Sequence, residues 1–213
     1  MISDTVYKAY LNHLLQGKRI ECTRIVQNFL DQRIPIKVLY TDLFQKSLYR
    51  VGELWEFNRI TVAKEHLATA ITEGLLNLTY PMLFESERGN QRKKVIISCS
   101  ANEYHQIGGK MVADICEFNG WDTHFLGANT PVDHMLEHIQ EIKPDLVGLS
   151  LSVYFNMACL KKELEAIRSN FTHLDILVGG QAFRWGGIDE IKKYAGIEYI
   201  PSIDELEKSI GIF

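Results

Sequence analysis

The sequence predicts a chain of two parts, an all-helical bundle followed by a doubly wound α/β domain with a parallel sheet. Three observations lead to this fold class. Residues 3–84 carry apolar side chains at helical spacing with almost no strand signal. Residues 85–94 are polar and charged, which is typical of a linker. Beyond them, short β-branched runs alternate with helical segments, as in a parallel sheet covered by helices.

The first part is expected to be an antiparallel four-helix bundle, because short breaks separate its helical segments. Gly17 suits the end of the first helix, Pro35 the first turn of the third, and Thr61 the N-cap of the fourth. The helices are predicted at about 4–15, 20–30, 35–56 and 61–82.

The second part is expected to be a five-stranded, flavodoxin-like (Rossmann-type) parallel α/β domain. The strands are predicted at about 94–99, 123–126, 145–151, 174–178 and 197–200, and the helices at about 107–119, 131–142, 155–169, 187–193 and 203–209. We therefore place the bundle at 1–86, the linker at 87–93 and the α/β domain at 94–213.

Composition narrows the classes of function. The net charge of −4 and the pI near 6.0 give no electrostatic footprint for direct binding of nucleic acid. No apolar run approaches the roughly 18 residues of a membrane span, and no signal-peptide pattern is present, so we expect a cytoplasmic protein. The four cysteines are scattered without C-x-x-C, which argues against a zinc site or a disulfide framework.

Three short features each follow a predicted strand. Glu103-x-His105-x-x-Gly108 follows the first strand, Ser150-Leu-Ser152 ends the third, and Gly179-Gly180 follows the fourth. Ligands of open α/β sheets bind at the carboxyl ends of the strands, so these features are expected to converge. Taken alone, the first is equally suited to a metal or to a phosphate.

The spacing of the three features is more informative. Gly108 and Ser150 are separated by 41 residues, and Ser152 and Gly179 by 26. This pattern resembles the cobalamin-binding domain of methionine synthase, corrinoid methyltransferases and cobalamin mutases, whose signature is D-x-H-x-x-G, S-x-L and G-G. Glu103 stands here for the family's Asp, and Ser152 for its usual Leu.

The resemblance covers nearly all of residues 93–213 and implies a cobalamin cofactor. His105 would then be the lower axial ligand of cobalt. The nucleotide tail would insert near the serines and the paired glycines. A carboxylate two residues from the histidine can fix its tautomer through the other ring nitrogen, as metal-ligating histidines require.

A second resemblance lies in the helical part, where Glu65-His66 follow Trp55 after nine residues. The pattern is similar to the cap of the light-sensing cobalamin regulators, in which such residues cover the upper face and leave room for adenosyl. By this resemblance the cap residues are Trp55, Val62, Glu65 and His66, and adenosylcobalamin is favoured over methylcobalamin. Glu56 follows the tryptophan, where the best-known photoreceptors carry a histidine.

The favoured function is a cobalamin-binding sensor that reports light or cofactor state to a partner. The cofactor would lie between the cap and the Rossmann-like domain, and the partner would be a transcription regulator or a second copy. Tyr7, Tyr10 and Tyr40 are candidates for that contact surface or for the bundle core. The alternatives are a corrinoid subunit that shuttles methyl groups between methyltransferases, and a module that binds a bilin with or instead of cobalamin. No base–nucleophile pair is apparent, so the chain alone is not expected to be an enzyme.

Overall fold

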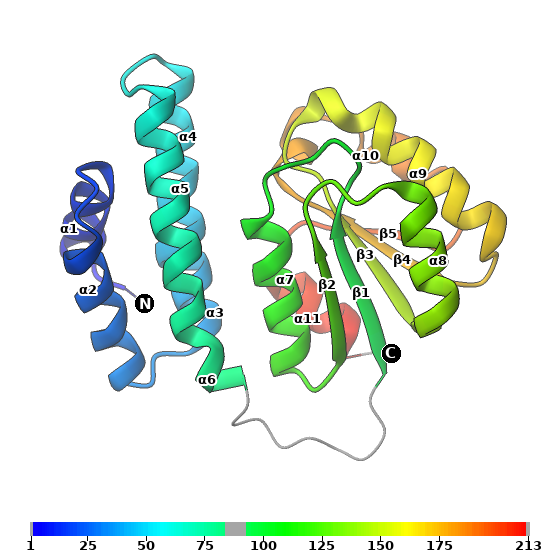
Figure 1. Ribbon diagram of the computed structural model, residues 1–213, viewed down its shortest axis with the longest axis horizontal. Helices are drawn as coiled ribbons and strands as arrows, with labels where there is room; N and C mark the ends of the chain where they lie inside the picture. The colour runs from blue at the N-terminus through cyan, green and yellow to red at the C-terminus, as the bar shows by residue number, and fades with distance from the viewer. Residues whose placement is uncertain (1, 84–92, 212–213) are drawn as a thin grey trace. The chain divides into compact units, whose positions relative to one another are not determined.

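The computed structural model describes residues 2–83 and 93–211 of the chain (Figure 1). The chain divides into two compact units, Met1–Glu85 and Ser86–Phe213, and each is described here by itself. Of the predicted linker 87–93, all but the last residue lies outside the described residues.

The first unit consists of helices that alternate in direction, as the sequence predicts (Figure 1). α5 contacts α1, α2 and α4, so it lies centrally in the bundle. Its predicted N-cap, Thr61, accepts a hydrogen bond of 3.4 Å from the backbone N–H of Lys64. The elements are α1 (Asp4–Leu15), α2 (Arg19–Asp31), α3 (Ile36–Val38), η1 (Leu39–Gln45), α4 (Lys46–Glu56), α5 (Val62–Leu76), η2 (Asn77–Thr79) and α6 (Tyr80–Leu83).

The predicted third helix is continuous, but its η1 segment is π-helical. The wider turn lets the segment bury four of its seven side chains: Leu39, Tyr40, Leu43 and Phe44. The Tyr40 hydroxyl lies 2.8 Å from the Thr79 hydroxyl inside the bundle.

The bundle core includes the tyrosines that the sequence left open as a contact surface. Tyr10 and Tyr40 are fully buried, and Tyr7 is 8% exposed. The core alternative is therefore confirmed, because a side chain inside the bundle is not available to a partner.

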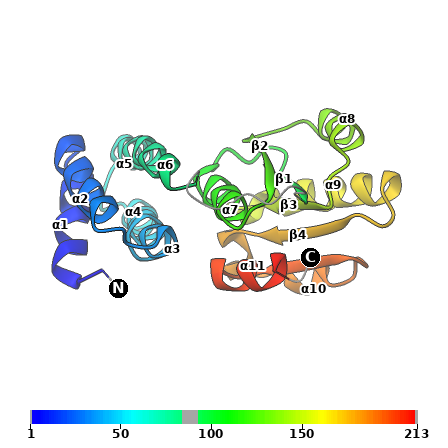
Figure 2. The same cartoon turned by 90° about the horizontal axis from the view of Figure 1, so that it is seen from below.

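The second unit is a five-stranded, fully parallel sheet in the order β2-β1-β3-β4-β5 (Figures 1 and 2). This is the predicted flavodoxin-like order. Its elements are β1 (Lys94–Cys99), α7 (Ile107–Phe118), β2 (Asp122–Gly127), α8 (Val132–Ile142), β3 (Leu146–Ser150), η3 (Tyr154–Asn156), α9 (Met157–Asn170), β4 (Asp175–Gly179), η4 (Gln181–Trp185), α10 (Ile188–Ile191), β5 (Ile197–Ile200) and α11 (Ile203–Ile210).

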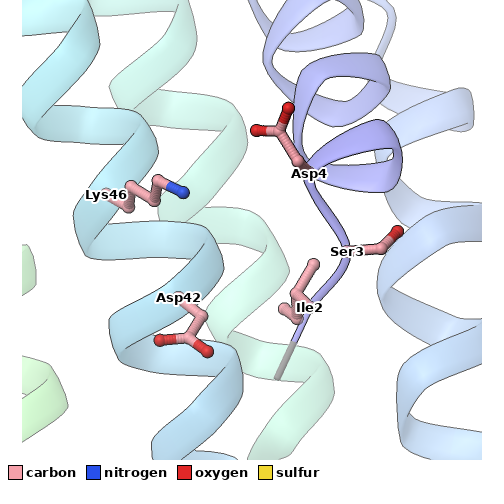
Figure 3. Close-up of a pocket in the computed structure, with 5 residues that line it drawn as sticks. All are labelled: Ile2, Ser3, Asp4, Asp42 and Lys46. Carbon is pink, nitrogen blue, oxygen red and sulfur yellow. The ribbon is translucent and has the colours of Figure 1, made fainter.

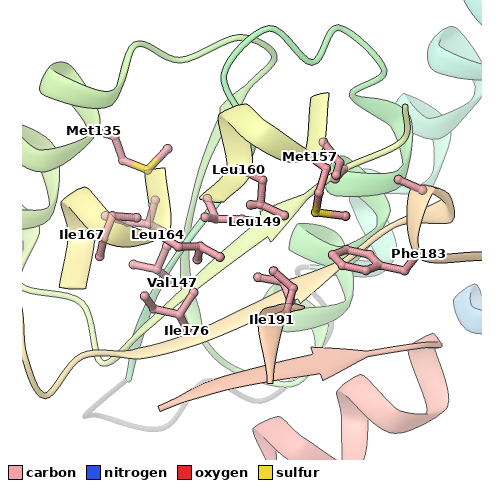
Figure 4. Packing of buried hydrophobic residues seen from close by; sticks show 14 of the residues in the cluster. Met135, Val147, Leu149, Met157, Leu160, Leu164, Ile167, Ile176, Phe183 and Ile191 are labelled. Atoms are coloured by element: carbon pink, nitrogen blue, oxygen red, sulfur yellow. The ribbon is translucent and has the colours of Figure 1, made fainter. Parts of the chain in front are cut away.

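Helices cover both faces of this sheet. α7 packs with α11, and α8 packs with α9 on the opposite face (Figure 1). Figure 4 shows the core between the sheet and α9, where Val147, Leu149 and Ile176 meet Leu160 and Leu164. Side chains buried on both faces explain why the strands read as continuous apolar runs.

The strand register places the three predicted features next to one another at the carboxyl edge of the sheet. Cys99 at the end of β1 pairs with Ser150, Ser150 pairs with Gly179, and Gly179 pairs with Ile200. The chain reverses its winding between β1 and β3, which is where ligands of such sheets bind. The loops that follow these two strands therefore form the candidate site.

Candidate functional site

The loop between β1 and α7 carries His105 with its ring oriented by Glu103. The His105 side chain is 58% exposed, and its Nδ1 lies 2.5 Å from Glu103 Oε1. The backbone N–H of His105 donates to the same oxygen at 3.0 Å. With Nδ1–H donated to the carboxylate, Nε2 is the nitrogen suited to coordinate a metal.

The Glu103 carboxylate is fully buried and is held on both oxygens. Its Oε2 accepts hydrogen bonds of 2.9 Å from the backbone N–H groups of Ser152 and Val153. Burial alone would raise the pKa of Glu103, but the bonds from the His105 ring and from three backbone N–H groups lower it to about 2. The carboxylate is therefore ionised and fixed in place.

Ser152 contributes to this arrangement through its backbone. Any residue except proline supplies the same N–H, so the departure from the family's leucine leaves the bond to Glu103 intact. The longer side chain of Glu103 spans from the histidine ring to the loop after β3, where an aspartate would be one methylene shorter.

Glycines let the start of α7 approach the end of β3. A Cβ at Gly109 would lie 3.3 Å from Cys99 Sγ and from a ring carbon of Phe125. A Cβ at Gly108 would lie 4.0 Å from Ser150 Oγ. The structure thus places Gly108 and Ser150, both predicted site residues, side by side at the edge of the sheet.

The glycine pair at the end of β4 also lies close to backbone atoms. A Cβ at Gly179 would lie 3.0 Å from the Ile200 carbonyl oxygen. Gly180 has φ +110° and packs on the backbone of Leu151, where a Cβ would overlap main-chain atoms. These glycines let the end of β4 and the loop after it pack directly on neighbouring backbone, next to Ser150.

The loop after β2 is tied to the histidine loop by asparagines. The backbone N–H of Asn102 donates to Asn129 Oδ1 at 2.9 Å, and the Asn129 N–H donates to the Glu103 carbonyl at 3.0 Å. Both asparagines have positive φ, +64° and +53°, which this residue type tolerates. The histidine loop is therefore anchored to the loops that follow both neighbouring strands.

Exposed aromatic side chains border this edge and were not singled out from the sequence. Tyr104 beside His105 is 69% exposed, Phe155 after β3 is 91% exposed, and Trp185 after β4 is 72% exposed. Their position in loops that directly follow strands was the available sequence signal. They offer flat apolar surface at the ligand-binding edge of the sheet.

The predicted cap residues gather at the hairpin between α4 and α5. Val62, Glu65 and His66 lie three and four residues apart, so they share one face of α5. Thr69 Oγ1 donates to Glu65 Oε1 at 2.9 Å, and His66 Nε2 lies 3.6 Å from Glu65 Oε2. Trp55 lies in the last turn of α4 and is 49% exposed.

A pocket of about 490 Å³ lies elsewhere in the bundle, beside the first residues of the chain (Figure 3). None of the predicted site residues lines it. Its lining consists of Ile2, Ser3, Asp4, Asp42 and Lys46. Asp4 is already paired with Lys8 at 2.6 Å, so the pocket offers no concentrated charge.

The described residues contain no group of three or more His, Cys, Asp or Glu side chains that could hold a metal ion. Among helices in the described ranges, none combines the length and the apolar character needed to cross a membrane.

Fold and site together define a ligand-binding α/β domain with one oriented imidazole at its carboxyl edge, preceded by a helical cap. Two family models, each described as "B12 binding domain", match the chain, one at residues 93–195 and the other at residues 6–79. The chain thus carries a B12-binding domain with an N-terminal helical cap, and its cofactor class is cobalamin.

Curated relatives include transcriptional repressors, methionine synthases and dimethylamine corrinoid proteins. The chain is 32% identical over 93 residues to the HTH-type transcriptional repressor CarA of Myxococcus xanthus, and 28% identical over 151 residues to CarH of the same organism. These matches cover 43% and 70% of the chain, but only 31% and 49% of the repressors. The dimethylamine corrinoid protein of Methanosarcina barkeri is 21% identical over 194 residues, which is 90% of each chain.

Solved structures share the fold. The monomethylamine corrinoid protein of Methanosarcina barkeri matches over 100% of both chains with a TM-score of 0.85 at 12% identity. The methanol:cobalamin methyltransferase complex MtaBC from the same organism matches over 99% of this chain and 80% of that chain, with a TM-score of 0.51 at 15% identity.

Proposed function

We propose that the chain is the corrinoid-carrying protein of a methyl-transfer system, with His105 as the lower axial ligand of cobalt. The observation that carries the proposal is the oriented histidine: a 58% exposed imidazole whose Nδ1 is held by a buried, ionised carboxylate at the β1/β3 switch point. Bound cobalamin would supply a cobalt atom able to carry a methyl group.

The residues of the chain hold and orient this cofactor. Glu103 fixes the tautomer of His105 and increases the basicity of Nε2. The nucleotide tail is proposed to lie beside Ser150, Ser152, Gly108, Gly179 and Gly180. The exposed rings of Tyr104 and Phe155 offer apolar surface to the macrocycle. On the cap, Trp55, Val62, Glu65 and His66 are proposed to contact the upper side of the cofactor.

The carrier function is favoured over the sensor by the extent of the similarity. The dimethylamine corrinoid protein corresponds to the chain over 90% of both lengths, whereas the repressors are matched over half their length or less. MtaBC, which resembles the chain in fold, is a complex with a methyltransferase. We therefore propose a methyltransferase as the protein partner.

A sensor of adenosylcobalamin is the second candidate, and the cap favours it. Identity to the repressors is higher than to the corrinoid protein, at 32% and 28% against 21%. The Trp55, Glu65 and His66 side chains resemble the cap of the light-sensing regulators. In this function the partner would be a transcription regulator or a second copy of the chain.

One experiment tests the cofactor and its ligand. The chain is loaded with methylcobalamin in the dark, and the absorption spectra of wild type, His105→Ala and His134→Ala are compared. His134 is a matched control because it is exposed on α8 with a carboxylate 3.2 Å away. We expect a histidine-coordinated spectrum that only His105→Ala removes, and identical spectra in all three proteins would overturn the assignment.

A second experiment separates the two functions. Methyl transfer from the loaded chain to a thiol, in the presence of a corrinoid methyltransferase, supports the carrier. A change of oligomeric state when the adenosylcobalamin-loaded chain is illuminated with green light, without such transfer, supports the sensor.

A further inference from the structure

A second buried carboxyl lies under the start of the histidine loop. Glu163 on α9 is fully buried, although glutamate is an ionisable residue. It has no ion-pair partner among the described residues. Its Oε2 accepts a hydrogen bond of 2.7 Å from Ser100 Oγ and one of 3.3 Å from the backbone N–H of Ala101. Ser100 and Ala101 are the first two residues of the loop that presents His105.

The two carboxyl oxygens of Glu163 differ in their hydrogen bonding. Oε1 is buried and has no hydrogen-bond partner within the described part of the chain. Glu103, in the same loop, has donors on both oxygens. A buried carboxylate oxygen without a donor is costly, whereas a protonated one is tolerated.

The electrostatics follow from this difference. Burial raises the pKa of Glu163 to about 7, against the lowering effect of the bonds from Ser100 and Ala101. In this loop geometry the Glu163 carboxyl therefore keeps its proton to a higher pH than a glutamate exposed to water does. By linkage, loss of that proton favours loop geometries in which the carboxyl reaches water.

We propose that Glu163 is a positioning residue for the axial histidine: its protonated carboxyl can stay buried beneath Ser100 and Ala101, whereas ionisation leaves Oε1 as a buried charge without a donor, loosens the loop and weakens coordination by His105. The proposal rests on the proposed function in taking His105 as the cobalt ligand. It adds a regulatory property, a coordination strength that falls as the pH rises through neutrality.

Other titratable groups near Glu163 do not account for such a step. Cys99 at the end of β1 feels the charge of Glu163, but burial raises the pKa of this thiol to about 12. Glu103 is already ionised. Cys159 lies one turn earlier in α9, and the buried side chains of α8, Met135 and Ile139, carry no charge.

The test is a pH titration of the cobalamin-loaded chain, followed by its absorption spectrum between about pH 5 and pH 9. In wild type, the histidine-coordinated fraction is expected to fall as the pH rises through about 7, apart from any loss at low pH when the imidazole itself is protonated. Glu163→Gln, which imitates the protonated carboxyl, is expected to remove the step near pH 7 and to keep the coordinated spectrum.

Two further variants make the test specific. Ser100→Ala removes a donor that stabilises the ionised form, so the midpoint is expected to move to higher pH. Glu165→Gln makes the same change of charge at an exposed position of α9 and is expected to behave as wild type. A step that is equal in wild type and Glu163→Gln, or that is absent from wild type, overturns the proposal.

A measurement without cofactor separates this proposal from the proposed function. The urea midpoint of the cofactor-free chain is expected to fall from pH 4.5 to about 7 in wild type and to stay level in Glu163→Gln. If no histidine-coordinated spectrum forms at any pH while this difference is present, the cobalt assignment fails and the protonation of Glu163 stands. Equal midpoints in both proteins reject the role of Glu163.

Discussion

Glu103→Gln tests whether the buried carboxylate holds the histidine loop together. Glutamine keeps one oxygen but turns an NH₂ group toward two of the four donors, which are supplied by His105, Ser152 and Val153. Two hydrogen bonds to a charged acceptor are lost, at about 1.5–3 kcal/mol each. The pKa of Glu103 leads to a similar magnitude, because a decrease from 4.5 to about 2 corresponds to about 3 kcal/mol.

We therefore expect Glu103→Gln to lower the free energy of unfolding by about 3 to 5 kcal/mol, measured by urea denaturation at neutral pH. Because the folded-state pKa is lowered, this stabilisation is fully present above pH 4.5 and is lost as the pH falls toward about 2. The control is Glu137→Gln, an exposed glutamate 3.2 Å from His134, which is expected to leave the midpoint unchanged. Equal midpoints for wild type and Glu103→Gln would refute the reasoning.

Four further outcomes are expected. Gly180→Ala should cost about 2–4 kcal/mol, because φ is +110° and the new Cβ meets the Leu151 backbone. Gly74→Ala, at an open position in the last turn of α5, should instead gain up to about 1 kcal/mol; a common melting temperature would contradict this. Arg168→Ala should cost about 2–4 kcal/mol in urea denaturation, since its guanidinium donates to the carbonyls of Thr172, Leu174 and Gly196. Raising the pH from 4.5 to about 7 should cost the cofactor-free chain about 3 kcal/mol, because the folded-state pKa of Glu163 is raised and the folded state must give up its proton; a level profile would exclude this. Trp55→Ala should leave the melting temperature nearly unchanged, because the side chain is half exposed, but should weaken adenosylcobalamin more than methylcobalamin in equilibrium binding; equal effects would remove Trp55 from the upper side of the cofactor.

The fold could be predicted from the sequence because the residue patterns that indicate each helix and strand lie within that element. β-branched runs such as 94–99 and the helical period of α7 each lie within one element, and their alternation implies the parallel sheet. The π-helical turn of η1 could not be predicted in this way. Its pattern of apolar residues is also that of an α-helix, so the order of residue types does not distinguish the two kinds of turn.

Within the site, sequence reasoning identified the residues that lie close together along the chain. Glu103 and His105 are two positions apart, and the contact between them was expected. The backbone N–H groups of Ser152 and Val153 were not predicted as partners of Glu103. Nearly every residue type carries a backbone N–H, so the sequence does not indicate which of them donate. Glu163 was missed because 63 positions separate it from Ser100 and a glutamate in a helix is usually exposed.

Two buried glutamates, one in the histidine loop and one beneath it, show that residue type alone does not determine the protonation state of a carboxyl group. Glu103 has donors on both oxygens and a pKa of about 2, so it serves as a fixed anion. Glu163 has donors on one oxygen and a pKa of about 7, so it can exchange a proton near neutrality. The difference arises because the His105 ring and the backbone N–H groups of His105, Ser152 and Val153 donate to both oxygens of Glu103, whereas Glu163 has donors on one oxygen alone. Hydrogen-bond donors on both oxygens thus keep Glu103 charged beside the histidine, whereas the buried Oε1 without a donor leaves Glu163 able to respond to pH.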